Sequence, residues 1–235
     1  MTLDAAKLQR YLPIVTLSIE FARRFYSNRT AEGKVEIWPT QGLETFWCDW
    51  PSGPAPSSNC CIDDMPTVSG ITSVLQKLLA LPTRFTTPAQ RDEWTTFLSQ
   101  MPALPMSADG TKLLPARVTS SGTHNSEPVE LYAVHPHRIM TVGRALVANV
   151  SLTAAINSYH TNPLARDNTG WTYGILDAAL LGQAEDALRM TLQRSASAPA
   201  PGYRFAGFAP HYQVRVDNHN KTITIRPPLF VLQFL

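Results

Sequence analysis

Apolar residues recur every three or four positions in two early stretches, which predicts two amphipathic helices. The first stretch covers residues 3–26, and Pro13 lies inside it, so we expect a kink or a late helix start there. The second covers residues 66–82, with Asp64 just before it as a candidate N-cap. Between the two helices, residues 28–64 favour loop structure and contain a proline-rich turn insert.

The rest of the chain predicts further helices. A Thr-Pro-Ala-Gln run at 87–90 is typical of a capping box with proline at the first helical position. A loop is expected at 102–128, and helical spacing follows at 136–146 and 151–159. The strongest pattern, WTYGILDAALLG followed by QAEDALRMTLQRS, joins at Gly182, which can take the left-handed conformation that ends a helix. Because strand–helix alternation and a glycine-rich phosphate loop are lacking, we predict an all-α body of helical hairpins with long loops.

Composition and charge narrow the classes of partner. The 235 residues are 44% hydrophobic and 16% charged, which indicates a globular chain long enough to bury a sizeable core. The net charge of +2 comes without a basic run, so nothing indicates nucleic-acid binding. Apolar stretches are too short or too charged to suggest a membrane span, and residues 1–13 do not resemble a signal peptide. We expect neither nucleic acid nor a membrane as a partner, and the oligomeric state stays open.

Cysteines and sequons nevertheless point to an oxidising compartment. Cys48, Cys60 and Cys61 lie close enough in sequence for one local disulfide with one thiol left over, and their pairing stays open. N-glycosylation sequons occur at Asn28, Asn149 and Asn220. We therefore expect that the parent protein is secreted and that this chain, which has no signal peptide, lacks an N-terminal part.

The stretch EIWPTQGLETFWCDW at residues 36–50 groups three of the five tryptophans around Glu44. Glycoside cleavage needs a carboxylic acid to protonate the leaving oxygen, and apolar neighbours raise the pKa of such an acid. Aromatic faces also match the C–H faces of sugar rings. Glu44 is therefore the candidate catalytic acid, and Trp38 and Trp47 are candidate sugar contacts. The alternative is an exposed loop acid beside ordinary core tryptophans.

A polar cluster follows in TSSGTHNSEPVELYAVHPHR, residues 119–138. Its candidate sugar contacts are His124, Asn125, Tyr132 and His135, on loops at the mouth of a helical body. The alternatives are loop capping and satisfied histidines, or the Asn/His/Tyr/Arg set of a polysaccharide lyase, which neutralises a uronate and abstracts its α-proton. Trp171 is a further candidate contact, although a tryptophan at a helix start also suits core packing.

Two of these segments resemble a known family. LYAVHPHRI at 131–139 and NTGWTYGILDAALLGQAEDALRMTLQR at 168–194 are similar to the C-terminal half of the six-hairpin glycosidases, most closely glycoside hydrolase family 95. There an LYGLYP-like segment precedes a TGWS-like segment. PTQGLE at 39–44 is similar to the family's PSxSPE stretch, in which the glutamate is the general acid. The resemblance covers about residues 35–213, with gaps.

The resemblance implies a fold and an activity. The fold would be a partial (α/α)6 toroid over residues 1–213, with helix faces left exposed where other hairpins should pack, and an unrelated tail at 214–235. The chain would be a fragment of a glycoside hydrolase that cleaves α-linked sugars, such as fucosides or galactosides, by inverting acid/base catalysis. Glu44 would be the general acid, and no cofactor or metal is implied.

The chain departs from the family pattern at three places. The family's asparagine pair, expected upstream of Glu44, has no counterpart in residues 1–35. Glu127 and Glu130 stand where the family has histidines, which suggests a different sugar preference and makes Glu130 a candidate sugar contact. The family's catalytic aspartate follows a PxFQ-like segment, but here the resemblance stops after Gln213. We therefore expect the catalytic base to be missing; Asp217 and the Asp63–Asp64 pair are the candidates for its place.

Other chemistries find little support in the sequence. His135-x-His137 and the cysteines lack CxxC or HExxH spacing, so no metal site is predicted. Ser121 and Ser126 lack the GxSxG context of a nucleophile. Two function classes remain: a glycoside hydrolase, or a non-catalytic protein that binds carbohydrate or another protein.

Overall fold

The computed structural model describes residues 4–48, 59–120, 122–125, 127–166, 173–196, 215–216 and 222–223. These residues are mostly helical, as the sequence predicts. The α-helices are α1 (Ala5–Phe25), α2 (Met65–Leu79), α3 (Pro88–Gln100), α4 (Val142–Ala148), α5 (Thr153–Thr161), α6 (Gly174–Leu180) and α7 (Ala184–Ala196). Three 3-10 helices accompany them: η1 (Thr83–Phe85), η2 (Val129–Ala133) and η3 (Pro163–Arg166). The strands are β1 (Ile62–Asp64), β2 (Ala116–Val118), β3 (Arg215–Val216) and β4 (Thr222–Ile223).

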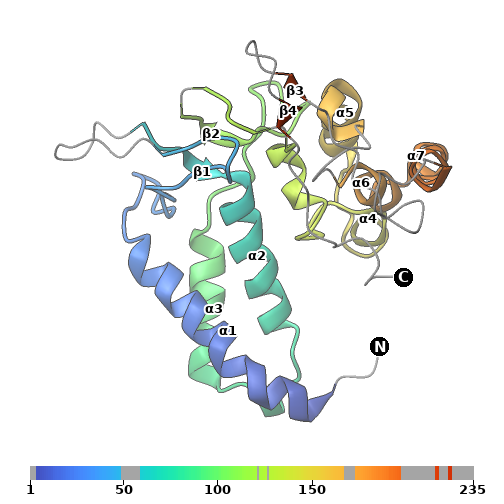
Figure 1. The fold of residues 1–235 in the computed structure, drawn as a ribbon. Helices are drawn as coiled ribbons and strands as arrows, with labels where there is room; N and C mark the ends of the chain where they lie inside the picture. The colour runs from blue at the N-terminus through green and yellow to red at the C-terminus, as the bar shows by residue number, and fades with distance from the viewer. Residues whose placement is uncertain are drawn as a thin grey trace.

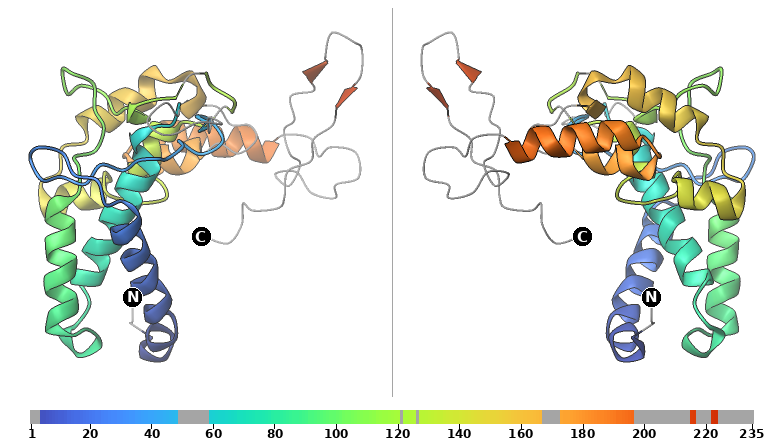
Figure 2. Two further views of the ribbon diagram at one scale, coloured as in Figure 1. Left: turned by 90° about the vertical axis from the view of Figure 1, so that its left-hand side faces the viewer. Right: turned by 90° about the vertical axis from the view of Figure 1, so that its right-hand side faces the viewer.

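The helices form two groups, each with its own core. Helices α1, α2 and α3 lie side by side, while α4 to α7 gather near the end of this group that carries the β1–β2 pair (Figures 1 and 2). The first core contains Ile37, Leu75 and Phe97. The second contains Leu131, Tyr159 and Met190. Leu104 packs against both cores and so connects the two groups.

Local capping signals define the helix starts as predicted. Asp64 caps α2, and both hydrogen bonds of the capping box at Thr87 and Gln90 are present at the start of α3. Asp4 caps α1, which starts at Ala5 and contains Pro13 in its interior. The expected late start of this helix is therefore wrong.

The segment around 136–146 differs from the prediction. It was expected to be one helix, but η2 ends at Ala133 and α4 begins only at Val142. Arg138 lies between them at φ 57°, a left-handed backbone conformation that interrupts a helix. The predictions of helix α5 and of a left-handed Gly182, at φ 76°, are confirmed.

Helix α1 has apolar residues on two faces. Ile19 is buried, with Leu12 and Val15 packed beside it against the first core. The opposite face leaves a large apolar stripe exposed, made of Tyr11, Ile14, Leu17, Phe21 and Phe25. Such a stripe agrees with the expectation that helix faces are left uncovered. The toroid itself stays a prediction.

Two antiparallel strand pairs complete the described structure. In the first, Ile62 pairs with Val118, which fastens the chain before α2 to the loop after α3. In the second, β3 pairs with β4 within the predicted tail, with Val216 opposite Thr222. Asp217 and most of the tail lie outside the described residues.

The buried cap of α2 predicts a large stability effect. Asp64 is fully buried and accepts hydrogen bonds from the Thr40 hydroxyl at 2.6 Å and the Thr67 amide at 3.1 Å. Asp64→Ala should lower the free energy of unfolding by about 2–4 kcal/mol, because the cap is lost and the Thr40 hydroxyl loses its acceptor. The matched change at the exposed cap of α1, Asp4→Ala, should cost at most about 1 kcal/mol. Chemical denaturation measures both, and equal losses would contradict the assignment.

Candidate functional site

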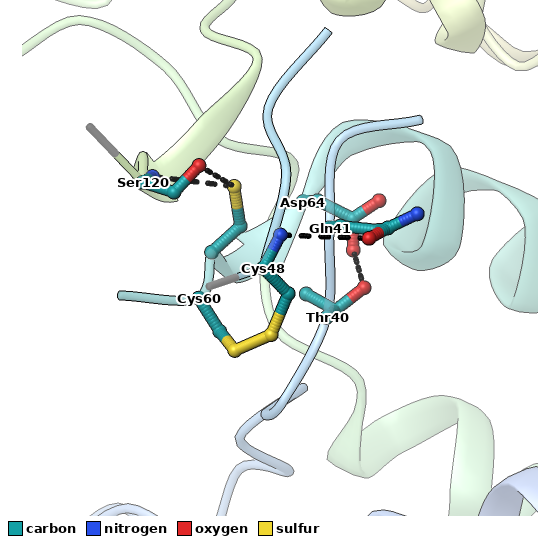
Figure 3. Close-up of a disulfide and its surroundings, with 7 residues drawn as sticks. Thr40, Gln41, Cys48, Cys60, Asp64 and Ser120 are labelled. Carbon is teal, nitrogen blue, oxygen red and sulfur yellow. Dashed lines mark hydrogen bonds between the residues drawn. A yellow bond between two sulfur atoms is a disulfide. The ribbon is translucent and has the colours of Figure 1, made fainter. Parts of the chain in front are cut away.

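The loop that carries Glu44 is fastened at both ends. Thr40 forms a β-bridge with Cys61, and Cys48 is joined to Cys60 by a disulfide (Figure 3). The Thr40 hydroxyl also donates to Asp64, so the loop is attached to the start of α2. Within the loop, Gly42 bridges to Phe46, which turns the chain around Glu44. Both ends of the loop are therefore fixed to the chain that leads into α2.

A second loop, residues 122–125, lies directly against the first. The His124 amide donates to the Thr45 carbonyl at 2.9 Å, and the Asn125 Nδ2 donates to Glu44 Oε2 at 3.3 Å. The Trp47 and His124 rings stack with centroids 4.1 Å apart and planes 8° apart. Four sequence-predicted site residues, Glu44, Trp47, His124 and Asn125, thus meet although about eighty residues separate the two loops.

Aromatic side chains do not bury Glu44, contrary to the prediction from the sequence. Glu44 is exposed, and Trp47 keeps 48% of its surface accessible, so the aromatic residues do not desolvate this carboxylate. Trp38 is partly buried. Trp50 and Trp171 lie outside the described residues. Glu44 as general acid therefore stays a prediction that rests on the family resemblance and on its contact with Asn125.

Desolvated acids lie beside Glu44 instead. Burial raises the pKa of Glu127, and the charge of Glu44 raises it further, while a hydrogen bond with Tyr132 works in the opposite direction. Burial also raises the pKa of Glu130, which accepts a hydrogen bond from Asn162 at 2.5 Å. Asp177 on α6 has the most buried of these carboxyl groups; burial and the charge of Glu130 raise its pKa well above the usual range. The acids thus become progressively more buried from Glu44 to Asp177.

Aromatic rings and a histidine accompany the acids. His135 lies against Tyr173 with ring centroids 4.7 Å apart, and its Nδ1 is buried with no hydrogen-bond partner in the described part of the chain. Burial, followed by the charges of Glu127, Tyr173 and Asp177, raises the pKa of Tyr132. Glu130, Tyr132 and His135, all predicted site residues, therefore belong to the same neighbourhood.

His137 fixes this neighbourhood to α2. Its Nδ1 lies 2.7 Å from the Ser69 hydroxyl, and the Ser73 hydroxyl donates to its carbonyl at 2.7 Å. A Cβ added at Gly70 would lie 3.2 Å from the His137 ring, so the glycine allows this close approach and a larger residue would displace the ring slightly. Burial lowers the pKa of His137 to about 4, which keeps the ring neutral.

The acid pair at 63–64 has structural roles. Asp63 accepts from the Ile37 amide at 2.8 Å and from Arg117 Nε at 2.7 Å, while Asp64 caps α2. Asp63 has a left-handed backbone conformation, with φ 52°, and the carboxylates of Asp63 and Asp64 contact different partners. These partners leave neither acid available as a substitute catalytic base.

Neither a metal-binding cluster nor a membrane-spanning helix is found among the described residues. No group of three or more His, Cys, Asp or Glu side chains in the described ranges is arranged to hold a metal ion. Among the described helices, none combines the length and apolar character that crossing a bilayer requires.

Sequence reasoning missed Asp177, Tyr173 and Asn162. Asp177 is the acid in the apolar helix sequence GILDAAL, and an isolated charge in such a helix was the available signal. Tyr173 precedes the same helix, and its carbonyl accepts from the Asp177 amide at 2.9 Å. Asn162 gave no signal, because its role depends on contact with Glu130 across the fold.

Comparison of the chain with protein-family models, with curated proteins and with solved structures finds no match. The likeness to six-hairpin glycosidases therefore rests on the sequence motifs alone.

The cysteine arrangement predicts a simple thiol count. Cys61 is buried and free, and its sulfur contacts Ser120 (Figure 3). The native oxidised chain should react slowly with a thiol reagent, the unfolded but unreduced chain should expose one thiol, and reduction should expose all three. Mass spectrometry of labelled peptides checks the pairing, with Cys61→Ala as the control. A disulfide-linked peptide that contains Cys61 instead of Cys60 would contradict it.

The neutral His137 predicts a pH effect on stability. Its pKa is about 4 in the folded chain, below the ordinary value of 6.5, so the unfolded chain binds this proton first as the pH falls. The free energy of unfolding that this histidine supports should therefore be lost as the pH falls from about 6.5 to about 4. Denaturation of the natural chain and of His137→Asn over this range measures the difference. If the two curves stay parallel, the buried neutral state is wrong.

Proposed function

We propose that the chain carries the sugar-binding site of a glycoside hydrolase that acts on α-linked sugars such as fucosides or galactosides. The observation that carries the proposal is the meeting of Glu44 with Asn125, beside the stacked Trp47 and His124 rings. An exposed carboxylate held by an amide and bordered by an open aromatic face provides both a reacting group and a surface for a sugar ring.

Glu44 is the general acid of this proposal, as the family resemblance implies. Its neighbour Glu127 is partly buried, and both its burial and the charge of Glu44 favour its protonated form. The raised pKa of Glu127 keeps a proton beside Glu44, and the proposal requires this proton to pass to Glu44 before Glu44 donates it to the leaving oxygen. Two adjacent carboxyl groups in different environments are the usual basis for separate acid and base roles.

Aromatic rings support the sugar-binding part of the proposal. Trp47 is about half exposed, and one face of its ring stacks on His124. The other face can receive the C–H face of a sugar. Tyr173, which is also partly exposed, provides a second ring, packed against His135. Rigid rings lose little conformational entropy when a ligand binds.

The lyase alternative is disfavoured by the charges of the site. A lyase of this type must hold a uronate, but here Glu44, Glu127, Glu130 and Asp177 gather in one neighbourhood. In the described residues, none of the four forms an ion pair with lysine or arginine. A negatively charged sugar would meet repulsion from these acids, and the charge of Arg138, which acts on His135, is a single cation against four acids.

An inverting reaction also needs a base, about 6.5–9.5 Å from the acid, to activate water. The family resemblance places this base beyond Gln213. That assignment stays a prediction. If the base is absent, the site can bind sugar without turnover, which is the non-catalytic alternative.

Turnover of aryl α-fucosides and α-galactosides tests the proposal. Glu44→Gln should lower kcat by about 10²–10⁴-fold, because general acid catalysis typically contributes this factor. Sugar binding, followed by Trp fluorescence, should persist in this variant and weaken in Trp47→Ala. Glu36→Gln, at a partly exposed acid that pairs with Arg117, is the matched control and should leave turnover unchanged.

Two results would decide against parts of the proposal. Binding without turnover in the natural chain would favour the non-catalytic alternative. If the natural chain shows neither sugar binding nor turnover, the proposed sugar site is wrong.

A further inference from the structure

Asp177 is a buried acid that still lacks a hydrogen-bond donor. It is 1% exposed and lies between Leu176 and Ala178 on α6. Its Oδ1 has no hydrogen-bond partner within the described part of the chain. A buried polar atom without a partner is costly in a native fold, so this atom calls for a donor that the described residues do not supply.

Glu130 is a second acceptor beside Asp177. It reaches this place from η2, whose neighbouring residues Val129 and Leu131 are buried, and it influences the charge state of Asp177. Asn162 satisfies one Glu130 oxygen. Neither acid forms an ion pair with a lysine or arginine of the described residues. The pair therefore has spare acceptor capacity and no ion-pair partner among the described residues, and the nearest cation noted at the subsite is Arg138, whose charge acts on His135.

His135 and Tyr173 complete the surroundings of the pair. His135 contributes a further buried acceptor position, its unpartnered Nδ1. The Tyr173 ring packs against the His135 ring at an angle of 45°, and the Tyr173 carbonyl accepts a hydrogen bond from the Asp177 amide. Tyr173 is 38% exposed, so the side of the cluster next to His135 reaches the solvent. Its π-face also attracts cations.

We propose that Glu130, Asp177 and His135 form a subsite for the protonated amino group of an amino sugar. An ammonium group supplies three hydrogen-bond donors and one positive charge, which matches two carboxyl groups without an ion-pair partner and the unpartnered Asp177 Oδ1 and His135 Nδ1. A hydroxyl group supplies one donor and no charge. A uronate would add a like charge. This inference rests on the proposed sugar site and extends it by naming the class of sugar.

Titrations with matched methyl hexosides test the subsite. The set comprises a neutral hexoside, its 2-amino-2-deoxy derivative, the N-acetylated form of that derivative and the hexuronide, at a pH where the amine is protonated. For the natural chain, calorimetry should show the amino sugar binding about tenfold or more tightly than the neutral hexoside, which corresponds to about 1.4 kcal/mol. The acetylated sugar should lose this advantage, and the hexuronide should bind most weakly.

Two isosteric variants assign the preference to the acids. Asp177→Asn and Glu130→Gln should each bring the affinities for the amino and neutral sugars to within about twofold of each other, since each removes a carboxyl group that a bound ammonium ion would hold in its charged form. Affinity for the neutral hexoside should change little. Asp109→Asn, at an exposed acid in another loop, is the matched control and should keep the full preference. Circular dichroism checks folding, and Glu130→Gln decides alone if Asp177→Asn does not fold.

The possible failures are distinguishable. If the amino and neutral sugars bind the natural chain equally, or if neither variant changes the ratio, the ammonium subsite is overturned while the sugar site stands. If no hexoside binds and Trp47→Ala has no effect, the proposed function fails and takes the subsite with it.

Discussion

The contact between His137 and α2 is the one on which the rest of the structure depends. The histidine is held by the Ser69 and Ser73 hydroxyls and by the absence of a side chain at Gly70. It joins the group of α1 to α3 to the group of α4 to α7, since η2 lies on the same segment. If this contact shifted, the acids and rings before it would lose their position relative to Glu44.

The candidate site combines two kinds of environment. At its outer end, Glu44 and Trp47 are exposed on a loop that a disulfide and the Asp64 cap hold in place. At its inner end, Asp177 is buried in an apolar helix. Water screens charge at the outer end and not at the inner end, so the same carboxyl chemistry can serve proton transfer at one and charge recognition at the other.

The sequence predicts those parts of the fold that depend on neighbouring residues. The Asp64 cap, the capping box at Thr87 and the left-handed Gly182 are local devices, and the structure confirms all three. The predicted helix at 136–146 was wrong because its first half is bound to α2 and to Ala133 by contacts that no local pattern encodes. Helix α1 does not start late at Pro13, because Asp4 caps it and it begins at Ala5.

The same distinction applies to the site. Motif spacing could single out Glu44, His124 and Asn125, since each lies in a recognisable segment. It could not show that Glu44 is exposed or that Asp177 lies beside Glu130, because both depend on how distant segments pack. An isolated acid in an apolar helix was the signal for Asp177, but such a residue has no assigned role until its neighbours are known.

Hydrogen–deuterium exchange with and without a saturating hexoside tests the central claim most directly, because it reports where a sugar binds without assuming which residue reacts. The account predicts slower exchange in two segments far apart in sequence, 42–47 and 122–135, with the start of α6 also protected. Protection confined to the groove between α1 and α3, lined by Leu17, Trp94 and Phe97, would contradict it, as would no change anywhere.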